Sequence, residues 1–142
     1  DLLAATQYVL PAVEVVDARV RKAAPGLPVG VPILDVVADN ANGAGVLLGS
    51  RRWRPTEIDL AGIGCTLSVN GEHAGSGDAS NVLGDPLRSL LWLAQRLRAQ
   101  GEALREGDLV MSGAFFGAMA VQPGDVVSAD FGGLGALGFQ VT

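Results

Sequence analysis

The dipeptide Asn70-Gly71 constrains the fold most, because it joins two segments with the pattern of neighbouring antiparallel strands. Before it, Ile58 to Val69 carries apolar residues at alternate positions, with one slip at Ala61-Gly62 that indicates a bulge. After it, a return strand is predicted from Glu72 towards Ser76. Residues 75–84, rich in Gly, Ser, Asn and Asp, are then expected to loop out.

A long amphipathic helix is predicted after Asp85, because aspartate suits the N-cap position and Pro86 suits the first helical position. Apolar side chains recur at spacings of three and four residues along one face, and Gly101 is expected to end the helix. The apolar positions of that face are Leu87, Leu90, Leu91, Ala94 and Leu97.

The remaining segments predict short elements. Helices are expected at residues 2–9 and 33–40, and a loop at residues 20–30, which hold two prolines and two glycines. Further strands are predicted at residues 12–17, 46–48, 109–112, 126–131 and 137–141, of which 46–48 and 109–112 are expected to be buried. Helices and strands do not alternate at βαβ lengths. The pattern of elements therefore predicts an α+β fold. Its sheet is expected to be a mixed, mostly antiparallel curved sheet or β-roll, with one long amphipathic helix.

Composition excludes several classes of protein. The length of 142 residues suits one domain, and the net charge of −5 argues against a nucleic-acid partner. One cysteine and one histidine cannot form an internal disulfide or a Cys/His zinc set, so a cytoplasmic location is expected. No apolar run approaches the roughly 20 residues of a membrane span, so no membrane partner is expected. Because the chain begins at Asp1, without a methionine, we expect a piece of a longer protein.

Glu14 is a carboxylate within the β-branched segment Ala12–Asp17, whose valines alternate. Such a conflict between a residue and its surroundings often marks a functional site. Two interpretations are open. Glu14 faces solvent or pairs with an arginine such as Arg19, or it has a metal-binding or catalytic role.

Asp39 and Asn40, followed by Asn42 and Gly43, also allow two interpretations. They can simply end a helix, or they can present short polar side chains and backbone N–H groups to a small anionic ligand. Ser112 is predicted at the end of a buried strand. Its hydroxyl is placed there either to meet a ligand or only to bond the backbone.

Three other features carry no chemistry in our interpretation. His73 follows the Asn70-Gly71 turn, and we expect it to be exposed. Cys65 is expected to be a small buried core residue. The glycines between Gly133 and Gly138 match a dinucleotide-binding pattern, but no helix can begin there, so we interpret them as hairpin glycines.

Five segments follow one another in an order and spacing typical of one family. They are residues 8–19 (YVLPAVEVVDAR), 37–41 (VADNA), 82–87 (VLGDPL), 101–114 (GEALREGDLVMSGA) and the glycine pattern at 124–125 and 133–135. Together they resemble the 2-keto-4-pentenoate hydratases and 4-oxalocrotonate decarboxylases of the fumarylacetoacetate hydrolase superfamily. The resemblance implies a fumarylacetoacetase C-terminal-like fold. It also implies that residues 1–142 are the C-terminal portion of a catalytic domain whose upstream part is absent.

The resemblance further implies a divalent cation, Mg²⁺ or Mn²⁺, held by three carboxylates, of which one maps to Glu14. The other two, a Glu-x-Glu pair, and a catalytic lysine lie upstream in the family and have no match in this chain. Asn42 and Ser112 stand where the family has serine and threonine, and they are expected to contact the substrate. Asp39 and Asn40 are expected to support the substrate pocket.

The function implied by this resemblance is that of a homo-oligomeric hydro-lyase in the catabolism of aromatic compounds. It would add water to a small 2-hydroxy-2,4-dienoate, of the 2-keto-4-pentenoate type, to give a 4-hydroxy-2-oxoacid. Two alternatives remain open. One is a decarboxylase of 2-oxo-3-enedioates, of the 4-oxalocrotonate type, and the other is a non-catalytic fragment or interaction subunit.

Overall fold

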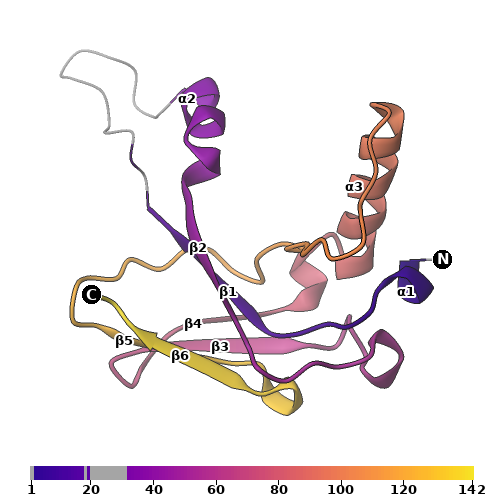
Figure 1. Cartoon of the computed structure of the whole chain (residues 1–142). Helices are drawn as coiled ribbons and strands as arrows, with labels where there is room; N and C mark the ends of the chain where they lie inside the picture. The colour runs from indigo at the N-terminus through magenta and orange to yellow at the C-terminus, as the bar shows by residue number, and fades with distance from the viewer. Residues whose placement is uncertain (1, 18, 20–31) are drawn as a thin grey trace. The chain divides into compact units, whose positions relative to one another are not determined.

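The computed structural model describes residues 2–17, 19 and 32–142 of the chain (Figure 1). The loop expected at residues 20–30 lies outside the described residues. Two compact units are present. We call them the β1–β2 unit, Ala12–Leu48, and the sheet unit, which combines Asp1–Pro11 with Gly49–Thr142. Each unit has its own antiparallel sheet, so the antiparallel pairing and the α+β class predicted for the chain are confirmed.

The sheet unit is built on four antiparallel strands in the order β4-β3-β5-β6. Strands β3 (Gly64–Val69) and β4 (Glu72–Asp78) form the hairpin predicted at Asn70-Gly71. The φ angles of Asn70 and Gly71 are +53° and +83°, and two positive values are what a type I′ turn requires. Strands β5 (Val126–Asp130) and β6 (Ala136–Gln140) form a second hairpin, and β5 also pairs with β3.

The apolar core of the sheet unit follows from alternation along its two central strands. Every second side chain of β3 and β5 points to the same face, so these strands contribute alternate residues to the interior. The connections after Asp59 and after β4 complete the core with small and β-branched side chains. The buried apolar residues are Ile63, Cys65, Leu67, Ala79, Val82, Val127 and Ala129.

The long helix α3 (Pro86–Ala99) begins as predicted. The Asp85 carboxylate accepts a hydrogen bond from the Leu87 N–H at 2.8 Å, which satisfies one of the free donors of the first turn. The helix ends at Ala99, and Gly101 follows the C-cap residue Gln100 with a φ of +78°, which allows the chain to turn away. Most of the predicted apolar stripe is half-buried, but Leu91 is 44% exposed.

The β1–β2 unit consists of an antiparallel ribbon with a short helix. Strand β1 (Ala12–Val16) pairs with strand β2 (Gly43–Leu48), and helix α2 (Ile33–Ala38) precedes β2. A one-turn segment, η1 (Asn40–Asn42), connects α2 to β2. A ribbon of two strands is only marginally stable by itself, because it has little apolar surface to bury.

Two predictions for the first 48 residues are partly wrong, one in the length of a helix and one in the burial of a strand. The helix expected at residues 2–9 is only the turn α1 (Leu2–Ala5), because Val9 pairs with Trp53 instead. The Val9 N–H donates to the Trp53 carbonyl at 2.8 Å, and this extended pairing excludes a helix there. The strand at 46–48 exists as part of β2, but it is not buried, since Val46 and Leu48 are 43% and 48% exposed.

The predicted bulge at Ala61-Gly62 is a turn. The Asp59 carboxylate accepts the Ala61 N–H at 3.2 Å, and the chain enters β3 only at Gly64. The irregularity of the hairpin falls later, between Leu67 and Ser68. Local alternation cannot distinguish these cases, because the aspartate side chain decides the turn.

The loop predicted at residues 75–84 is also wrong in its first part. Strand β4 continues to Asp78, where Gly75 pairs with Leu67 and Gly77 with Cys65. Glycine is usually depleted in strands, but here it allows close approach of other backbone. A β-carbon on Gly77 would lie 2.3 Å from the Phe115 carbonyl oxygen, so only glycine fits.

The strand predicted at residues 109–112 is not formed. In the part of the chain that the structure describes, no strand pairs with this segment, and Leu109 is 54% exposed. Apolar and β-branched residues favour a strand only where a neighbouring strand provides a ladder. Across residues 2–17 and 32–142, no helix has the length and apolarity to cross a membrane.

Candidate functional site

Glu14 lies on the exposed face of β1. The alternation predicted from the sequence is observed, with Glu14 and Val16 exposed and Val13 and Val15 half-buried. Glu14 stands opposite Val46 in the pairing with β2. The strand therefore directs the carboxylate away from the half-buried side of the ribbon.

A hollow of about 310 Å³ lies beside this carboxylate, a volume at the lower end of the range that holds small molecules. We call it the Glu14 hollow. It is lined by Glu14, Asn40, Gly43, Ala44, Gly45 and Val46.

Gly43 lies close to the polar groups of the Glu14 hollow. A β-carbon on Gly43 would lie 3.1 Å from the Asn40 carbonyl oxygen, 3.2 Å from Asn40 Nδ2 and 3.7 Å from Glu14 Oε1. The amide and the carboxylate therefore converge on one glycine. Its lack of a side chain keeps the floor of the Glu14 hollow open.

Asn40, Ala41 and Asn42 form a left-handed turn, with φ angles of +54°, +52° and +64°. Asparagine tolerates this region because its short amide can bond locally, whereas alanine has no such compensation. Strained backbone of this kind persists only where its surroundings hold it. The Asn42 carbonyl accepts the Asp17 N–H at 2.8 Å, which ties the turn to the end of β1.

Arg19 holds the other end of this turn through Asp39, the residue that caps α2. The Asp39 carboxylate accepts the Arg19 backbone N–H at 2.9 Å and its Nε–H at 2.6 Å. Nη2 of Arg19 donates to the Asp39 carbonyl at 2.7 Å and to the Gly43 carbonyl at 3.1 Å. Arg19 thus pairs with Asp39, so the ion pair considered for Glu14 is not formed.

Ser112 belongs to the sheet unit, in the irregular segment where a buried strand was predicted. Ser112 is half-buried, and its carbonyl accepts a hydrogen bond from Ser89 Oγ of α3 at 2.6 Å. The structure therefore brings Glu14 and Asn40 to one hollow, with Asn42 in the adjoining turn and Asp39 just before that turn. It describes Ser112 only within the other unit.

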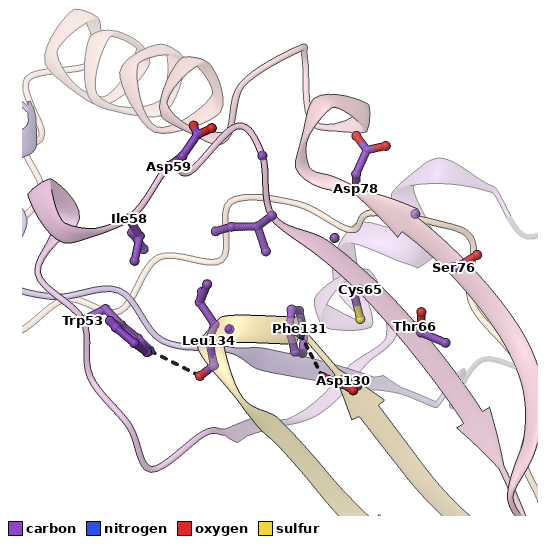
Figure 2. Close-up of a pocket in the computed structure, with 16 residues that line it drawn as sticks. Trp53, Ile58, Asp59, Cys65, Thr66, Ser76, Asp78, Asp130, Phe131 and Leu134 are labelled. Atoms are coloured by element: carbon purple, nitrogen blue, oxygen red, sulfur yellow. Dashed lines mark hydrogen bonds between the residues drawn. The ribbon is translucent and has the colours of Figure 1, made fainter.

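A second hollow of about 770 Å³, larger than the Glu14 hollow, lies in the sheet unit and contains none of the predicted site residues (Figure 2). Figure 2 shows Trp53, Leu134 and Phe131 along one side of it, with Asp59 and Asp78 on the other. Trp53 Nε1 donates to the Leu134 carbonyl at 3.2 Å, so its polar edge is already used.

Each of the three carboxylates that line this larger hollow accepts a hydrogen bond within a local turn. Asp59 accepts the Ala61 N–H, Asp78 accepts from Ser80, and Asp130 accepts the Gly132 N–H at 2.8 Å. The hydrogen bonds from Ser80 lower the pKa of the Asp78 carboxyl. The positions of the three carboxylates are therefore explained by the local turns that they stabilise.

Cys65 and His73 behave as expected from the sequence. Cys65 is buried, and burial, aided by the charge of Asp130, raises the pKa of its thiol to about 11. A thiol held neutral at pH 7 is a poor nucleophile. His73 is exposed beside the hairpin turn. The glycines after Gly132 form a turn between β5 and β6, not the start of a nucleotide-binding helix.

The Glu14 hollow offers hard oxygen ligands, but too few for a complete metal site. Glu14 supplies a carboxylate and Asn40 a backbone carbonyl oxygen, both of the type that Mg²⁺ and Mn²⁺ prefer. Within residues 2–17, 19 and 32–142, no group of three or more His, Cys, Asp or Glu side chains could hold a metal ion. The donors present fit one side of a cation site.

Sequence reasoning missed two residues of this region, Arg19 and Gly43. Arg19 was considered only as a partner of Glu14, since nothing local connects it with Asp39, 20 positions away. For Gly43, both helix punctuation and a backbone N–H facing an anionic ligand were considered, and the close approach at its α-carbon was missed. Glycine in a strand often marks such an approach, but the strand was predicted to begin only at Val46, whereas β2 begins at Gly43.

The fold and the sequence segments that carry the family resemblance define a class of protein. A sequence model described as the C-terminal part of fumarylacetoacetate (FAA) hydrolase matches residues 9–142, so the chain belongs to this family. The family resemblance drawn from the sequence is confirmed.

Individual relatives narrow the comparison. The chain is 37% identical over 142 residues to a 4-oxalocrotonate decarboxylase of a Pseudomonas species, covering 100% of this chain and 52% of that protein. It is 36% identical over 137 residues to a 2-keto-4-pentenoate hydratase of Paraburkholderia xenovorans strain LB400, covering 96% of this chain and 49% of the relative. The chain thus spans about half the length of these curated relatives.

A solved structure shows the same fold. It is a 4-oxalocrotonate decarboxylase from Pseudomonas putida G7, complexed with magnesium and adipate. The TM-score is 0.89 at 34% sequence identity, and the match covers 100% of this chain and 52% of that one.

Proposed function

We propose that this chain forms one side of the active site of a divalent-metal-dependent lyase, which hydrates a 2-hydroxy-2,4-dienoate to a 4-hydroxy-2-oxoacid. The observation that carries the proposal is the Glu14 hollow, where a strand carboxylate and the Asn40 amide converge on Gly43. Membership of the family and relatives named as hydratases support the reaction class. The remaining carboxylates and a catalytic lysine would come from an upstream part of the protein.

Glu14 is the residue of this chain that would hold the cation, which we take to be Mg²⁺ or Mn²⁺. A related structure contains magnesium, and a second structure of that enzyme contains calcium. When bound, such a cation supplies Lewis-acid stabilisation of the enolate oxygen of a 2-oxoacid. The exposed, extended position of Glu14 supports this role, since its oxygens are free to face a ligand rather than Arg19.

The other predicted site residues orient the substrate in this proposal. Asn42 has amide donors for a carboxylate oxygen, and Ser112 has a hydroxyl that can donate or accept. Asp39 and Asn40 would brace the pocket, which agrees with the contacts of Asp39 to Arg19 and of Asn40 to Gly43. The left-handed turn that carries Asn40 and Asn42 would limit the orientations open to a bound substrate.

The proposed setting follows the same resemblance. The substrate is a small 2-oxo or 2-hydroxydienoate acid from the breakdown of aromatic compounds. We propose that the protein acts as a homo-oligomer in the cytoplasm, with no nucleic-acid or membrane partner.

A decarboxylase of 2-oxo-3-enedioates is the second candidate function. It keeps the metal and the enolate but breaks a carbon–carbon bond to release CO₂. The specific support is that relatives named decarboxylase and hydratase match this chain at nearly equal identity, 37% and 36%. A non-catalytic interaction subunit is the candidate of a different class, because the described residues do not complete a metal site.

A product assay of the intact protein distinguishes these candidates. The protein is supplied with Mg²⁺ or Mn²⁺ and given either a 2-hydroxy-2,4-dienoate or a 2-oxo-3-enedioate. Loss of dienoate absorbance with a product heavier by one water identifies the hydratase. Release of CO₂ from the enedioate, without hydration of the dienoate, identifies the decarboxylase. No reaction with either substrate and no binding of Mn²⁺ would leave the non-catalytic role.

A further inference from the structure

Arg19 makes more contacts to the Glu14 region than an ordinary surface arginine. Its backbone N–H and Nε–H reach both carboxylate oxygens of Asp39, and its Nη2 reaches two backbone carbonyl oxygens. The Asp39 side chain is only 9% exposed, whereas that of Arg19 is 50% exposed. Four bonds from one residue thus fix both ends of the segment from Asp39 to Gly43.

The segment between these two anchors is the strained left-handed turn. The left-handed region is sterically unfavourable for a residue with a β-carbon, and Ala41 has no side-chain bond to offset that cost. Without an external hold, the turn is expected to relax towards ordinary backbone angles. Arg19 supplies that hold at Asp39, before the turn, and at Gly43, after it.

Relaxation of the turn would move the Glu14 hollow as well. Asn40 is the first residue of the turn, and its carbonyl oxygen and Nδ2 stand within 4 Å of the β-carbon position on Gly43, as Glu14 Oε1 does. A rotation of the Asn40 backbone would carry its amide away from the carboxylate. The geometry of the hollow therefore depends on how the turn is held.

We propose that Arg19 is a positioning residue, which clamps the left-handed turn and so keeps the Asn40 amide beside the Glu14 carboxylate. The inference rests on the proposed function for the role of Glu14. A merely structural ion pair would stabilise the unit without affecting what Glu14 binds. The bonds to two carbonyl oxygens argue against that simpler role, because they define the backbone path and not only a charge pairing.

The direct test is Arg19→Lys in the intact protein. Lysine keeps the positive charge, so the electrostatic effect on a nearby cation is preserved, but it loses the planar fork that reaches several acceptors. Affinity for Mn²⁺, followed by the electron paramagnetic resonance of the free ion, is expected to fall about tenfold or more, as for other residues that orient a metal ligand. Arg105→Lys is the matched control, since Arg105 pairs with exposed Glu102 at 4.0 Å in the sheet unit.

A rescue experiment separates positioning from general stabilisation. Ala41→Gly lowers the cost of the left-handed turn, so it is expected to restore much of the Mn²⁺ affinity that Arg19→Lys loses. Asp39→Asn, which removes the charged partner at the same anchor, is expected to weaken Mn²⁺ binding like Arg19→Lys. Unchanged Mn²⁺ affinity in both Arg19→Lys and Asp39→Asn would overturn the proposal.

The conformation of the turn provides a readout that does not need a metal. Backbone carbon chemical shifts and three-bond couplings of Asn40 to Asn42 report whether the turn is left-handed. They are expected to change in Arg19→Lys and to remain unchanged in Arg105→Lys. If the wild-type protein binds no Mn²⁺, the proposed function fails, and the clamp is then tested by these couplings alone. Couplings in the Arg19→Lys variant that equal those of the wild-type protein would overturn the clamp.

Discussion

The two units of the molecule are stabilised in different ways. All the buried residues of the described chain lie in the sheet unit, and the seven of its apolar core are mainly on β3, β5 and the turn after β4. In the β1–β2 unit, none of the described residues from Ala12 to Leu48 is buried. Its shape depends on the strand ladder, the bonds of Arg19 and a left-handed turn. The candidate site therefore lies where polar contacts, rather than apolar packing, fix the geometry.

This difference has a physical consequence for function. Regions with few buried contacts open at a lower free energy than a packed core, and binding segments are often found there. A polar clamp also fixes particular atoms, whereas an apolar core mainly fixes volume. We expect the sheet unit to determine the stability of the chain, and the β1–β2 unit to determine what it binds.

The largest expected effect is on the packed core. Leu67→Ala, on β3, removes a side chain that is 8% exposed and should lower the free energy of unfolding by about 3 kcal/mol. Leu47→Ala is the matched variant on β2, where the side chain is only half-buried, and about 1 kcal/mol is expected. Urea unfolding monitored by circular dichroism measures both values. Equal losses in the two variants would contradict the contrast between the units.

The next effect concerns the strained turn. Ala41→Gly should raise the stability of the β1–β2 unit by up to about 1 kcal/mol, because glycine adopts positive φ without a steric cost. Leu83→Gly is the counterpart in the sheet unit, where Leu83 has a φ of +55° and is 64% exposed. Hydrogen exchange should show slower exchange within β1 and β2 for the first variant only. Faster exchange there would show that Ala41 is not strained.

The smallest expected effect is a pH dependence of the stability of the sheet unit. Asn70 and the Gln122 N–H donate to the Asp125 carboxylate at 2.8 Å each, and these bonds lower its pKa below the ordinary value of 3.8. A carboxyl whose pKa is lower in the folded state than in the unfolded state stabilises the fold at pH values above the unfolded-state pKa. That stabilisation is lost as the pH falls through the folded-state pKa. Between pH 5 and 3, the urea midpoint of the wild-type protein should fall slightly more than that of Asp125→Asn. An equal fall in both would remove Asp125 from this account.

Features set by neighbouring residues could be predicted from the sequence. Asn70-Gly71 gave the hairpin and Asp85-Pro86 gave the start of α3, because turn and cap preferences act within a few residues. The strand expected at 109–112 was wrong because a strand also needs a neighbour to pair with.

The candidate site shows the same limit. Glu14 could be selected because a carboxylate among alternating valines is a local conflict, and the structure shows it exposed as that pattern requires. The Arg19–Asp39 contact could not be predicted, since it joins residues 20 positions apart and depends on the path of the chain between them. The roles of Asn42 and Ser112 remain predictions.

The most direct test of the central claim is a Mn²⁺ titration of the intact wild-type protein, Glu14→Gln and Glu72→Gln. Glu72 is the matched control, an exposed strand glutamate on β4 in the sheet unit. We predict that Glu14→Gln weakens Mn²⁺ binding by at least about tenfold, because a ligand matters no less than the residues that orient it. Glu72→Gln should bind like the wild-type protein. The same dissociation constant in all three proteins would contradict a metal-binding role for Glu14.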